Sequence, residues 1–462
     1  MAKGMRTSRS ARLVDLGTLA GSEVAKQAAT RTANLVRSDR RAQMALEARQ
    51  AEFAERLVIV LGSMRGAAMK FGQMLSMIDG GLLPEGQRAQ FQGKLAALQD
   101  QAPDVPWETM RAHIECELGH EFSTVFADFP EHAIAAASIG QVYRATLHDG
   151  RVVAVKVQYP EIETAVRSDL KNLAMFLGAY KLVHTGLDVK ALTVELEERI
   201  LAELDYELEA ANTRAIAREY RDHPFIRVPD VVSSACSTRV LVTEWLDGKP
   251  LSAAYDAPLP ERNRIAEILF RFYSGTPHRM SLYSGDPHPG NSLLLDDGSV
   301  GFLDFGLVKQ LDAETAETEI AYLRALIEGD PARLVEALSE HGWIADRDAF
   351  TPQAIYDAFL EIAGWYVRDE EITLTPEIAN AIIAGAINPH SQTYQIVRRQ
   401  NLPPEHAFRG RAEVHLAAVL GQLRPQLNLH RVAREWLYDD PPATALGRLQ
   451  RDWELTRGTP LA

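Results

Sequence analysis

SGDPHPGNSLLLDDGSVGFLDFG, at residues 284–306, joins a rigid loop to a short hairpin and indicates the fold of the whole chain. The loop Asp-Pro-His-Pro-Gly-Asn at 286–291 cannot lie inside a helix, because its two prolines lack an amide donor and fix φ. Two short apolar runs, Ser292–Leu295 and Val300–Leu303, flank an Asp-Asp-Gly turn sequence. This pattern predicts a β-hairpin directly after the loop.

Three polar side chains in this stretch have the spacing of a kinase-type phosphoryl-transfer site. Asp286 lies in the loop, Asn291 follows five residues later, and Asp304 ends the second strand before Phe-Gly. Triphosphate oxygens bound with magnesium need hard oxygen ligands, which Asn291 and Asp304 would supply. Asp286 would orient or deprotonate a nucleophile. Asp-Phe-Gly alone would fit any polar loop beside a buried hairpin, so the prediction depends on all three side chains.

Length and composition limit the classes of function that this chain can have. The 462 residues are enough for two or three domains, and an apolar content of 46% is enough for their cores. The formal net charge of −14 argues against nucleic acid as a partner, because phosphate binding needs a basic surface. Residues 1–50 differ, with ten Lys or Arg against four Asp or Glu. Such a basic arm suits an anionic membrane surface, although it also fits a solvated tail.

The sequence carries no pattern typical of export or membrane insertion. The N-terminus lacks the apolar core of a signal peptide, and no run of about 18 apolar residues predicts a transmembrane helix. Cys116 and Cys236 lie far apart and match no zinc or redox spacing, which favours a reducing cytosol. We therefore expect a cytoplasmic protein, with peripheral contact at the inner face of the membrane left open.

The region before residue 129 is expected to be helical. Apolar residues recur at helical spacing from about Ala51 to Leu75, and this helix carries Lys-Phe-Gly-Gln at 70–73. A lysine in a helix is usually a surface residue, so the helix alone assigns no function to Lys70. Further helices are expected at Gln87–Leu98 and at Trp107–Leu118.

A second hairpin is expected from Ile139–Leu147 and Val152–Val157, which flank a His-Asp-Gly turn. Lys156 interrupts the second strand and needs an anionic partner, since an unpaired buried charge is costly. In kinases the lysine of this strand holds the nucleotide's phosphates. Where a kinase carries its glycine-rich loop, this chain has Ala135, Ala136, Ala137 and Ser138. Their amides could face phosphates, but alanine methyls restrict close approach, so altered nucleotide selectivity or reduced transfer is expected.

An acidic helix is predicted over Leu187–Tyr220. Charges of this kind ordinarily form a solvated face. Glu203 and Glu209 are six residues apart, hence about 120° apart around a helix, so one can face Lys156 while the other reaches another cation. Asp205 and Glu209 would share a face at i,i+4 spacing.

Two more strands are expected at Arg227–Val232 and Arg239–Trp245. In a kinase-like fold the second would lead into the hinge, where backbone groups from Glu244 to Leu246 would hydrogen-bond adenine. Gly248 would then permit the turn into the next lobe. An ordinary strand end is the alternative interpretation.

From Pro260 onward the chain is predicted to be mostly helical. Helices are expected at Arg262–Ser274, Ala313–Gly329, Pro331–His341, Pro352–Tyr366, Pro376–Ala384, Arg409–Gly421 and Ala445–Trp453. No Ala-Pro-Glu motif follows Asp304, as it would in a protein-kinase activation segment. The last helix is amphipathic and, with the basic arm, is a candidate for membrane-surface contact.

Taken together, these motifs resemble the UbiB-type atypical kinases, also called the ADCK family of protein-kinase-like proteins. The resemblance covers about residues 57–310, and several of its motifs occur in no ordinary protein kinase. It depends on six segments: KFGQ at 70–73, AAASIGQV at 135–142, VAVKVQ at 153–158, ELDYELEAAN at 203–212, DPHPGN at 286–291 and LDFG at 303–306.

The resemblance implies an α+β, bilobal protein-kinase-like fold with a helical N-terminal extension and a mostly helical C-lobe. The domains expected are a basic, partly disordered arm at 1–50, a helical extension at 51–128, an N-lobe at 129–247, a C-lobe at 248–440 and a tail at 441–462.

The resemblance also implies a site for ATP or ADP with Mg²⁺. The residues expected to take part in catalysis are Asp286, Lys156, Lys70, Gln73, Glu203, Asp205 and Glu209. Those expected to contact the nucleotide are Ala135, Ala136, Ala137, Ser138, Lys156, Glu244 and Leu246, and the metal ligands would be Asn291 and Asp304. Lys70 would pair with Glu203 and Lys156 with Glu209, and Lys70 would either restrain turnover or be required for it.

Family members are linked to isoprenoid quinone biosynthesis and lipid homeostasis, and they behave as ATPases or unorthodox kinases near membranes. The resemblance therefore implies an acceptor such as water or a small lipid-like molecule, with a prenyl lipid or quinone precursor as partner. Two alternatives stay open: a small-molecule kinase of the aminoglycoside or choline type, and a nucleotide-binding scaffold without transfer activity.

The chain departs from the family in two places. Ser284-Gly285 stands where the family usually has a His or Phe followed by Ala. A C-terminal pair of transmembrane helices, found in some bacterial members, has no counterpart in this sequence, which favours peripheral association.

Overall fold

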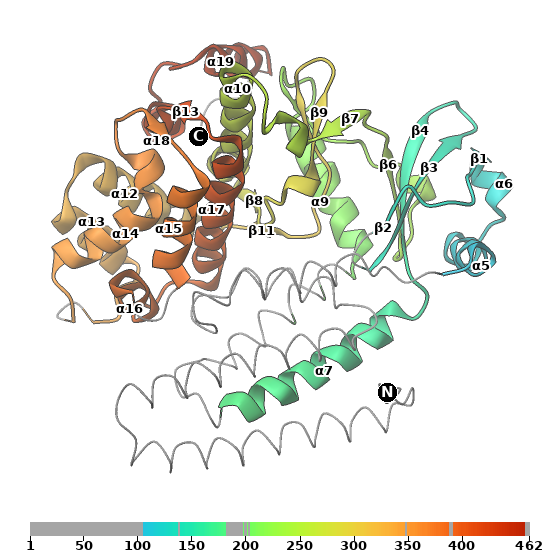
Figure 1. The fold of residues 1–462 in the computed structure, drawn as a ribbon, viewed down its shortest axis with the longest axis horizontal. Helices are drawn as coiled ribbons and strands as arrows, with labels where there is room; N and C mark the ends of the chain where they lie inside the picture. Colours follow the sequence, from blue (N-terminus) through green and yellow to red (C-terminus); the bar gives the residue numbers. More distant parts are fainter. Residues whose placement is uncertain are drawn as a thin grey trace. The chain divides into compact units, whose positions relative to one another are not determined.

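The computed structural model describes residues 105–136, 139–181, 204–346, 349–387 and 391–457, together with Glu197 and Leu201 (Figure 1). The predicted helices at Ala51–Leu75 and Gln87–Leu98 lie outside these residues. The chain separates into two compact units, and each is described by itself. The first ends at Tyr206 and includes Ala235–Val242, and the second holds Glu207–Ser234 and the chain from Thr243 onward.

The first unit contains a sheet in the order β1-β3-β4-β6, with β2 paired to β3. Its strands are β1 (Phe126–Asp128), β2 (Ala135–Ala136), β3 (Gly140–Leu147), β4 (Val152–Gln158) and β6 (Val240–Glu244). The predicted hairpin is confirmed, since β3 and β4 pair from Gly140 opposite Gln158 to Thr146 opposite Val152. At Gly140 a Cβ would overlap the carbonyl oxygen of Val157, so the close approach of these strands requires glycine.

Three helices accompany this sheet: α5 (Trp107–Leu118), α6 (Phe122–Val125) and α7 (Ile162–Lys181). The predicted helix α5 is confirmed, and it ends at Gly119 in the left-handed conformation. The α5 ring of Trp107 packs on Phe122 and Phe129. Helix α7 was not predicted, although Ile162, Val166 and Leu170 recur at helical spacing and are buried.

The second unit contains the predicted catalytic hairpin. Strands β9 (Ser292–Leu295) and β10 (Val300–Phe302) pair with Val300 opposite Leu294, which confirms the hairpin. The sheet continues on both sides, in the order β5-β10-β9-β7, with β5 at Ile226–Arg227 and β7 at Gly248–Pro250. Two smaller pairs join β8 (Leu282–Ser284) to β11 (Val308–Gln310) and β12 (Ile372–Thr373) to β13 (Gln426–Leu427).

One strand prediction and one turn prediction in this unit were wrong. The strand expected at Arg227–Val232 is limited to β5 and an isolated bridge from Val231 to Thr243, because Pro229 cannot donate to a ladder. Gly248 does not form a turn. It lies in β7, where a Cβ would be 2.9 Å from Leu293 Cβ, so glycine is needed there for close packing.

The acidic helix also differs from its prediction. The predicted helix is interrupted: Glu197 and Leu201 are helical, the Leu204 amide bonds to Leu201 in a turn, and α9 spans Tyr206–Glu219. The other residues from 187 to 203 lie outside the described part of the chain. The predicted shared face of Asp205 and Glu209 is therefore wrong: Asp205 is exposed, whereas Glu209 is 2% exposed.

The rest of the second unit is helical, as predicted. After α10 (Leu259–Phe270) a π-helical turn at Arg271–Gly275 leads into α11 (Thr276–Met280). The later helices are α12 (Ala313–Glu328), α13 (Pro331–Glu340), α14 (Pro352–Val367), α15 (Pro376–Ile387), α16 (Gln392–Arg398), α17 (Pro404–Leu423), α18 (Leu429–Leu437) and α19 (Ala445–Arg457). Of these, α16 and α18 were not predicted.

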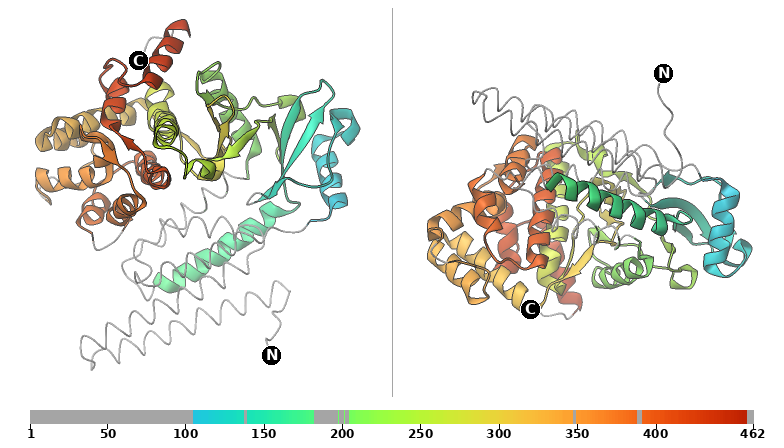
Figure 2. Two further views of the ribbon diagram at one scale, coloured as in Figure 1. Left: turned by 45° about the horizontal axis from the view of Figure 1, so that its top comes forward. Right: turned by 90° about the horizontal axis from the view of Figure 1, so that it is seen from below.

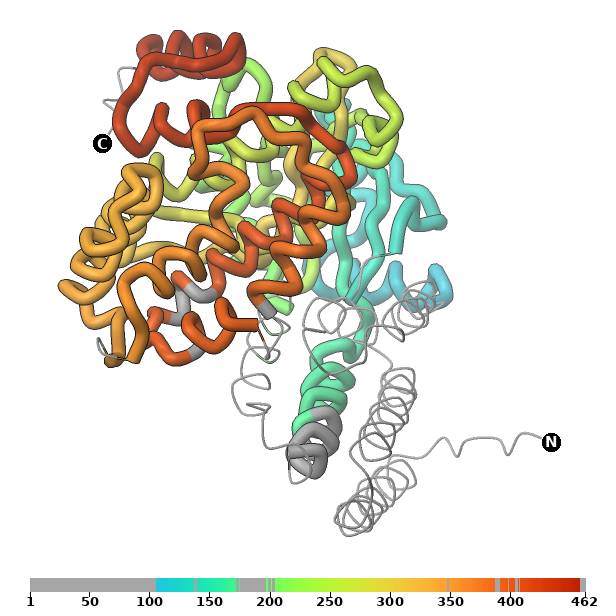
Figure 3. Tube along the Cα trace, turned by 60° about the vertical axis from the view of Figure 1, so that its left-hand side comes forward, coloured from blue at the N-terminus to red at the C-terminus, as the bar shows by residue number. Residues whose placement is uncertain are grey.

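Helices α12–α17 pack against one another as a bundle (Figures 2 and 3). The starts of α12, α13 and α14 follow from capping, because the side chains of Asp312, Asp330 and Thr351 each accept the amide three residues later. The α+β class predicted from the sequence is confirmed. No helix among the described residues combines the length and apolar character needed to cross a membrane.

Candidate functional site

The loop after β8 brings Asp286 and Asn291 together. Asn291 Nδ2 donates to the Asp286 main-chain oxygen at 3.2 Å and to its Oδ2 at 3.3 Å. The His288 side chain accepts the Gly290 amide at 3.1 Å, which fixes the turn between them. The Leu303 amide donates to the Asn291 carbonyl at 3.0 Å and ties the loop to the hairpin. With its Nδ2 turned to Asp286, Asn291 has Oδ1 as its potential metal ligand.

The segment Asp304-Phe305-Gly306 forms the second part of the site. The Gly306 amide donates to Asp304 Oδ1 at 3.0 Å, and the Phe305 ring is buried in the core. Asn212 of α9 donates from Nδ2 to the Phe305 carbonyl at 3.0 Å. A Cβ on Gly306 would lie 3.5 Å from Asp304 Oδ1 and 3.7 Å from Glu209 Oε2, so α9 places the Glu209 carboxylate beside this turn.

Tyr273 is a site residue that the sequence analysis missed. Loss of contact with water raises the pKa of Tyr273, and the Asp286 and Asp304 carboxylates raise this pKa further, whereas a hydrogen bond to Ser292 lowers it. The phenol therefore stays protonated near both carboxylates. Its position depends on the π-helical turn at Arg271–Gly275, which widens the helix and has no visible signal in the sequence.

In the first unit Lys156 lies on β4 opposite Val142 and is half-buried. Its Nζ is 5.0 Å from the centroid of the Tyr206 ring, a cation–π contact with a buried side chain. Ala135 and Ala136 form the exposed strand β2. Lys156 and the β2 alanines thus occur in one sheet, and their contact with phosphates stays a prediction.

The expected adenine contacts involve the end of β6. The Glu244 amide donates to the Asp230 carbonyl at 2.8 Å, so this amide is engaged. An adenine contact at Glu244 would therefore have to use its carbonyl oxygen. Leu246 is half-buried, with Cδ1 3.0 Å from where a Gly301 Cβ would lie.

Some expected residues lie outside the described part of the chain. They are Lys70, Gln73, Ala137, Ser138 and Glu203. The pairing of Lys70 with Glu203 stays a prediction for this reason. The pairing of Lys156 with Glu209 also stays a prediction, because the two residues belong to different units.

The structure gives a physical reason for Gly285, where the chain departs from the family pattern. A Cβ at Gly285 would overlap Cε1 of Phe408 and lie 2.5 Å from its Cζ. Phe408 belongs to α17, is 9% exposed and packs 5.9 Å from the Tyr283 ring. The aromatic ring thus occupies the volume that an alanine methyl would need beside Asp286.

Gly285→Ala is expected to destabilise the second unit by about 1–3 kcal/mol, because the added methyl overlaps the Phe408 ring. Phe408→Leu removes the ring atoms that clash, so the double variant should recover most of the lost stability. Denaturant unfolding of the single and double variants measures both effects. A Gly285→Ala protein with wild-type stability would contradict this packing argument.

Comparison with known proteins identifies the kind of domain that this chain contains. The sequence model of one protein family, the ABC1 atypical kinase-like domain, matches residues 97–338 of this chain. A chloroplastic relative from Arabidopsis thaliana, named Protein ACTIVITY OF BC1 COMPLEX KINASE 1, is 33% identical over 306 residues, which is 65% of this chain and 44% of the relative. Atypical kinase COQ8B, mitochondrial, from Rattus norvegicus is 34% identical over 311 residues, or 67% of this chain and 57% of the relative. The matched part spans about half the length of these curated relatives.

One solved structure is similar to this chain over most of the length of both proteins. It is the complex of Rv3197 with erythromycin from Mycobacterium tuberculosis, with 31% sequence identity and a TM-score of 0.60, covering 87% of this chain and 98% of that chain. These similarities confirm the predicted α+β protein-kinase-like fold. They also confirm the predicted resemblance to atypical kinases.

Proposed function

Because the chain belongs to the ABC1 atypical kinase-like family, we propose that it binds ATP or ADP with Mg²⁺ and catalyses phosphoryl transfer or ATP hydrolysis. The observation that carries this proposal is the loop in which Asn291 bonds to Asp286, beside the Asp304–Gly306 turn. Carboxylate and amide oxygens at these positions are the ligand types that Mg²⁺ prefers.

Each residue has a distinct part in the proposed mechanism. Asn291 and Asp304 would hold Mg²⁺, which neutralises charge on the phosphates when bound. Lys156 would bind the phosphates, and Asp286 would orient the attacking oxygen and accept its proton. The rate of transfer would then come from positioning and charge neutralisation, because phosphoryl transfer requires little covalent chemistry by the protein itself.

We further propose that the acceptor is water or a small lipid-like molecule, in support of isoprenoid quinone or other prenyl-lipid metabolism. The resemblance to UbiB-type kinases supports this class of partner. The basic arm at residues 1–50 supports a cytoplasmic protein that contacts an anionic membrane surface peripherally. The alanine-rich segment from Ala135 supports limited transfer to protein substrates.

Steady-state phosphate release tests the proposal. We expect Mg²⁺-dependent release from ATP that rises when anionic liposomes and a prenyl-phenol are added. Neutral liposomes are the control for a membrane effect that does not involve charge. No release under any of these conditions, together with measurable nucleotide binding, would favour a scaffold that binds nucleotide without transfer.

A small-molecule kinase is the second candidate, and the similar Mycobacterium tuberculosis protein, solved with erythromycin, supports testing it. Aminoglycoside and choline kinases use the same order of Asp, Asn five residues later and a second Asp. A screen of alcohols that includes erythromycin would favour this candidate if one of them became phosphorylated stoichiometrically with ATP consumption.

A further inference from the structure

Helix α9 contacts the site along its first half and the C-terminal helix at its far end. In the first half, Glu209 lies beside Gly306 and Asn212 holds the Phe305 carbonyl at 3.0 Å. The helix is 14 residues long, so it extends about 20 Å to Glu219. Because a helix of this length is stiff, a shift of its C-terminal end also moves the residues in its first half.

The far end of α9 is held by Trp453 of the C-terminal helix α19. Its indole N–H donates to the Arg221 carbonyl at 3.0 Å, just beyond the end of α9. The ring meets His223 edge to face at 4.4 Å and lies parallel to Tyr220 at 6.3 Å. Trp453 is 7% exposed, and both partner rings are buried. This tryptophan therefore fills the space directly after the last turn of α9.

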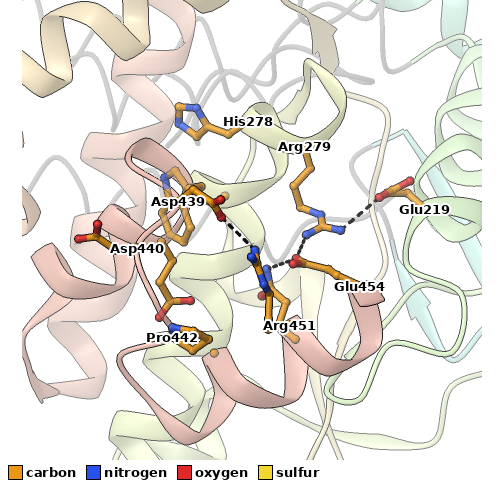
Figure 4. A pocket seen from close by; sticks show the side chains of 13 residues that line it. Glu219, His278, Arg279, Asp439, Asp440, Pro442, Arg451 and Glu454 are labelled. Carbon is orange, nitrogen blue, oxygen red and sulfur yellow. Dashed lines mark hydrogen bonds and ion pairs between the residues drawn. The ribbon is translucent and has the colours of Figure 1, made fainter. Parts of the chain in front are cut away.

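An ionic cluster surrounds the same contact. Arg279 of α11 is 3.5 Å from Glu219 and forms an ion pair with Glu454, and Figure 4 shows it between these two carboxylates. Arg279 and Glu454 are 11% and 8% exposed, so their attraction is little screened by water. Arg457 donates to the Glu219 carbonyl, which satisfies a terminal oxygen of α9. Contacts of Trp453, Glu454 and Arg457, which lie within about one and a half turns of α19, thus join this helix to the end of α9.

We propose that Trp453 and Glu454 are positioning residues: through them α19 fixes the orientation of α9, and α9 in turn holds Asn212 and Glu209 against Asp304–Gly306. This inference rests on the proposed nucleotide site at that turn. Displacement of catalytic groups by about 1 Å can reduce turnover about 100-fold, so a small tilt of α9 is enough to matter.

Hydrogen exchange of the full chain tests the coupling without reference to activity. The two variants are Trp453→Phe, which keeps a ring but loses the indole N–H, and Glu454→Gln. In both, the amides at 305–306 and 209–213 should exchange at least about tenfold faster than in the wild-type protein. Amides of the α12–α17 bundle should be unchanged. Leu455→Ala, on the same helix and 70% exposed, is the matched control and should behave as wild type.

Turnover supplies the second measurement. Both variants should lower kcat for phosphate release by about 10–100-fold, with Mg-ATP affinity within about threefold of wild type. Faster exchange confined to α19 and residues 216–223, or spread evenly over the second unit, would overturn the proposal. If the wild-type protein releases no phosphate, the proposed function fails, whereas the exchange result still decides the coupling.

Discussion

Asp304→Asn is expected to lower the affinity for Mg-ATP about 100-fold or more and to abolish turnover. The substitution removes the negative charge that would hold Mg²⁺. It keeps an oxygen that can accept the Gly306 amide, as Asp304 Oδ1 does at 3.0 Å. The turn should therefore survive, and the loss should fall on metal and nucleotide binding. Calorimetry with ATP in the presence of Mg²⁺ and of a chelator measures both.

Asp296→Asn is the matched control for this variant. Asp296 lies on the same hairpin, in the exposed turn between β9 and β10, and also loses one negative charge. It should bind Mg-ATP as wild type does. Full Mg-ATP affinity in Asp304→Asn would refute the metal role of Asp304 and remove the main support for the proposed mechanism.

Glu319→Ala is expected to lower the free energy of unfolding by about 3–5 kcal/mol. Glu319 is fully buried in α12, where it pairs with Arg409 and accepts from His406 Nδ1 at 2.9 Å. Burial lowers the pKa of His406 to about 4, so the imidazole is neutral at pH 7. Among the described residues, removing Glu319 leaves Glu413 at 3.3 Å as the carboxylate partner of the Arg409 guanidinium, which is 4% exposed.

Glu317→Ala provides the comparison, because Glu317 is exposed on the same helix, two residues away. Its removal should change the free energy of unfolding by no more than about 0.5 kcal/mol. Chemical denaturation of both variants measures the difference. Equal effects would mean that the buried network around Arg409 contributes little to the stability of the second unit.

Local chemistry made much of the fold predictable. Two short apolar runs around an Asp-Asp-Gly turn located the β9–β10 hairpin, and the prolines beginning α13 and α14 located those helices to within a residue or two. The order Asp286, Asn291, Asp304 likewise indicated the site, because residues close in sequence form it.

Features that depend on distant contacts were not predictable. The need for glycine at 285 comes from Phe408, more than a hundred residues later. The approach of Tyr273 to two carboxylates depends on a π-helical turn, and the role of Trp453 depends on a carbonyl at Arg221. The break in the acidic helix before α9 begins at Tyr206 was missed because helical periodicity continued across a turn at Leu204–Asp205.

The contact between Gly285 and Phe408 also constrains how this chain can diverge. A methyl group at 285 and a six-membered ring at 408 compete for one volume, so a lineage must lose one before it can gain the other. Relatives with alanine before the loop aspartate should therefore carry a smaller side chain at the position equivalent to Phe408. Glycine there should accompany an aromatic ring, and the two sites should substitute as a pair.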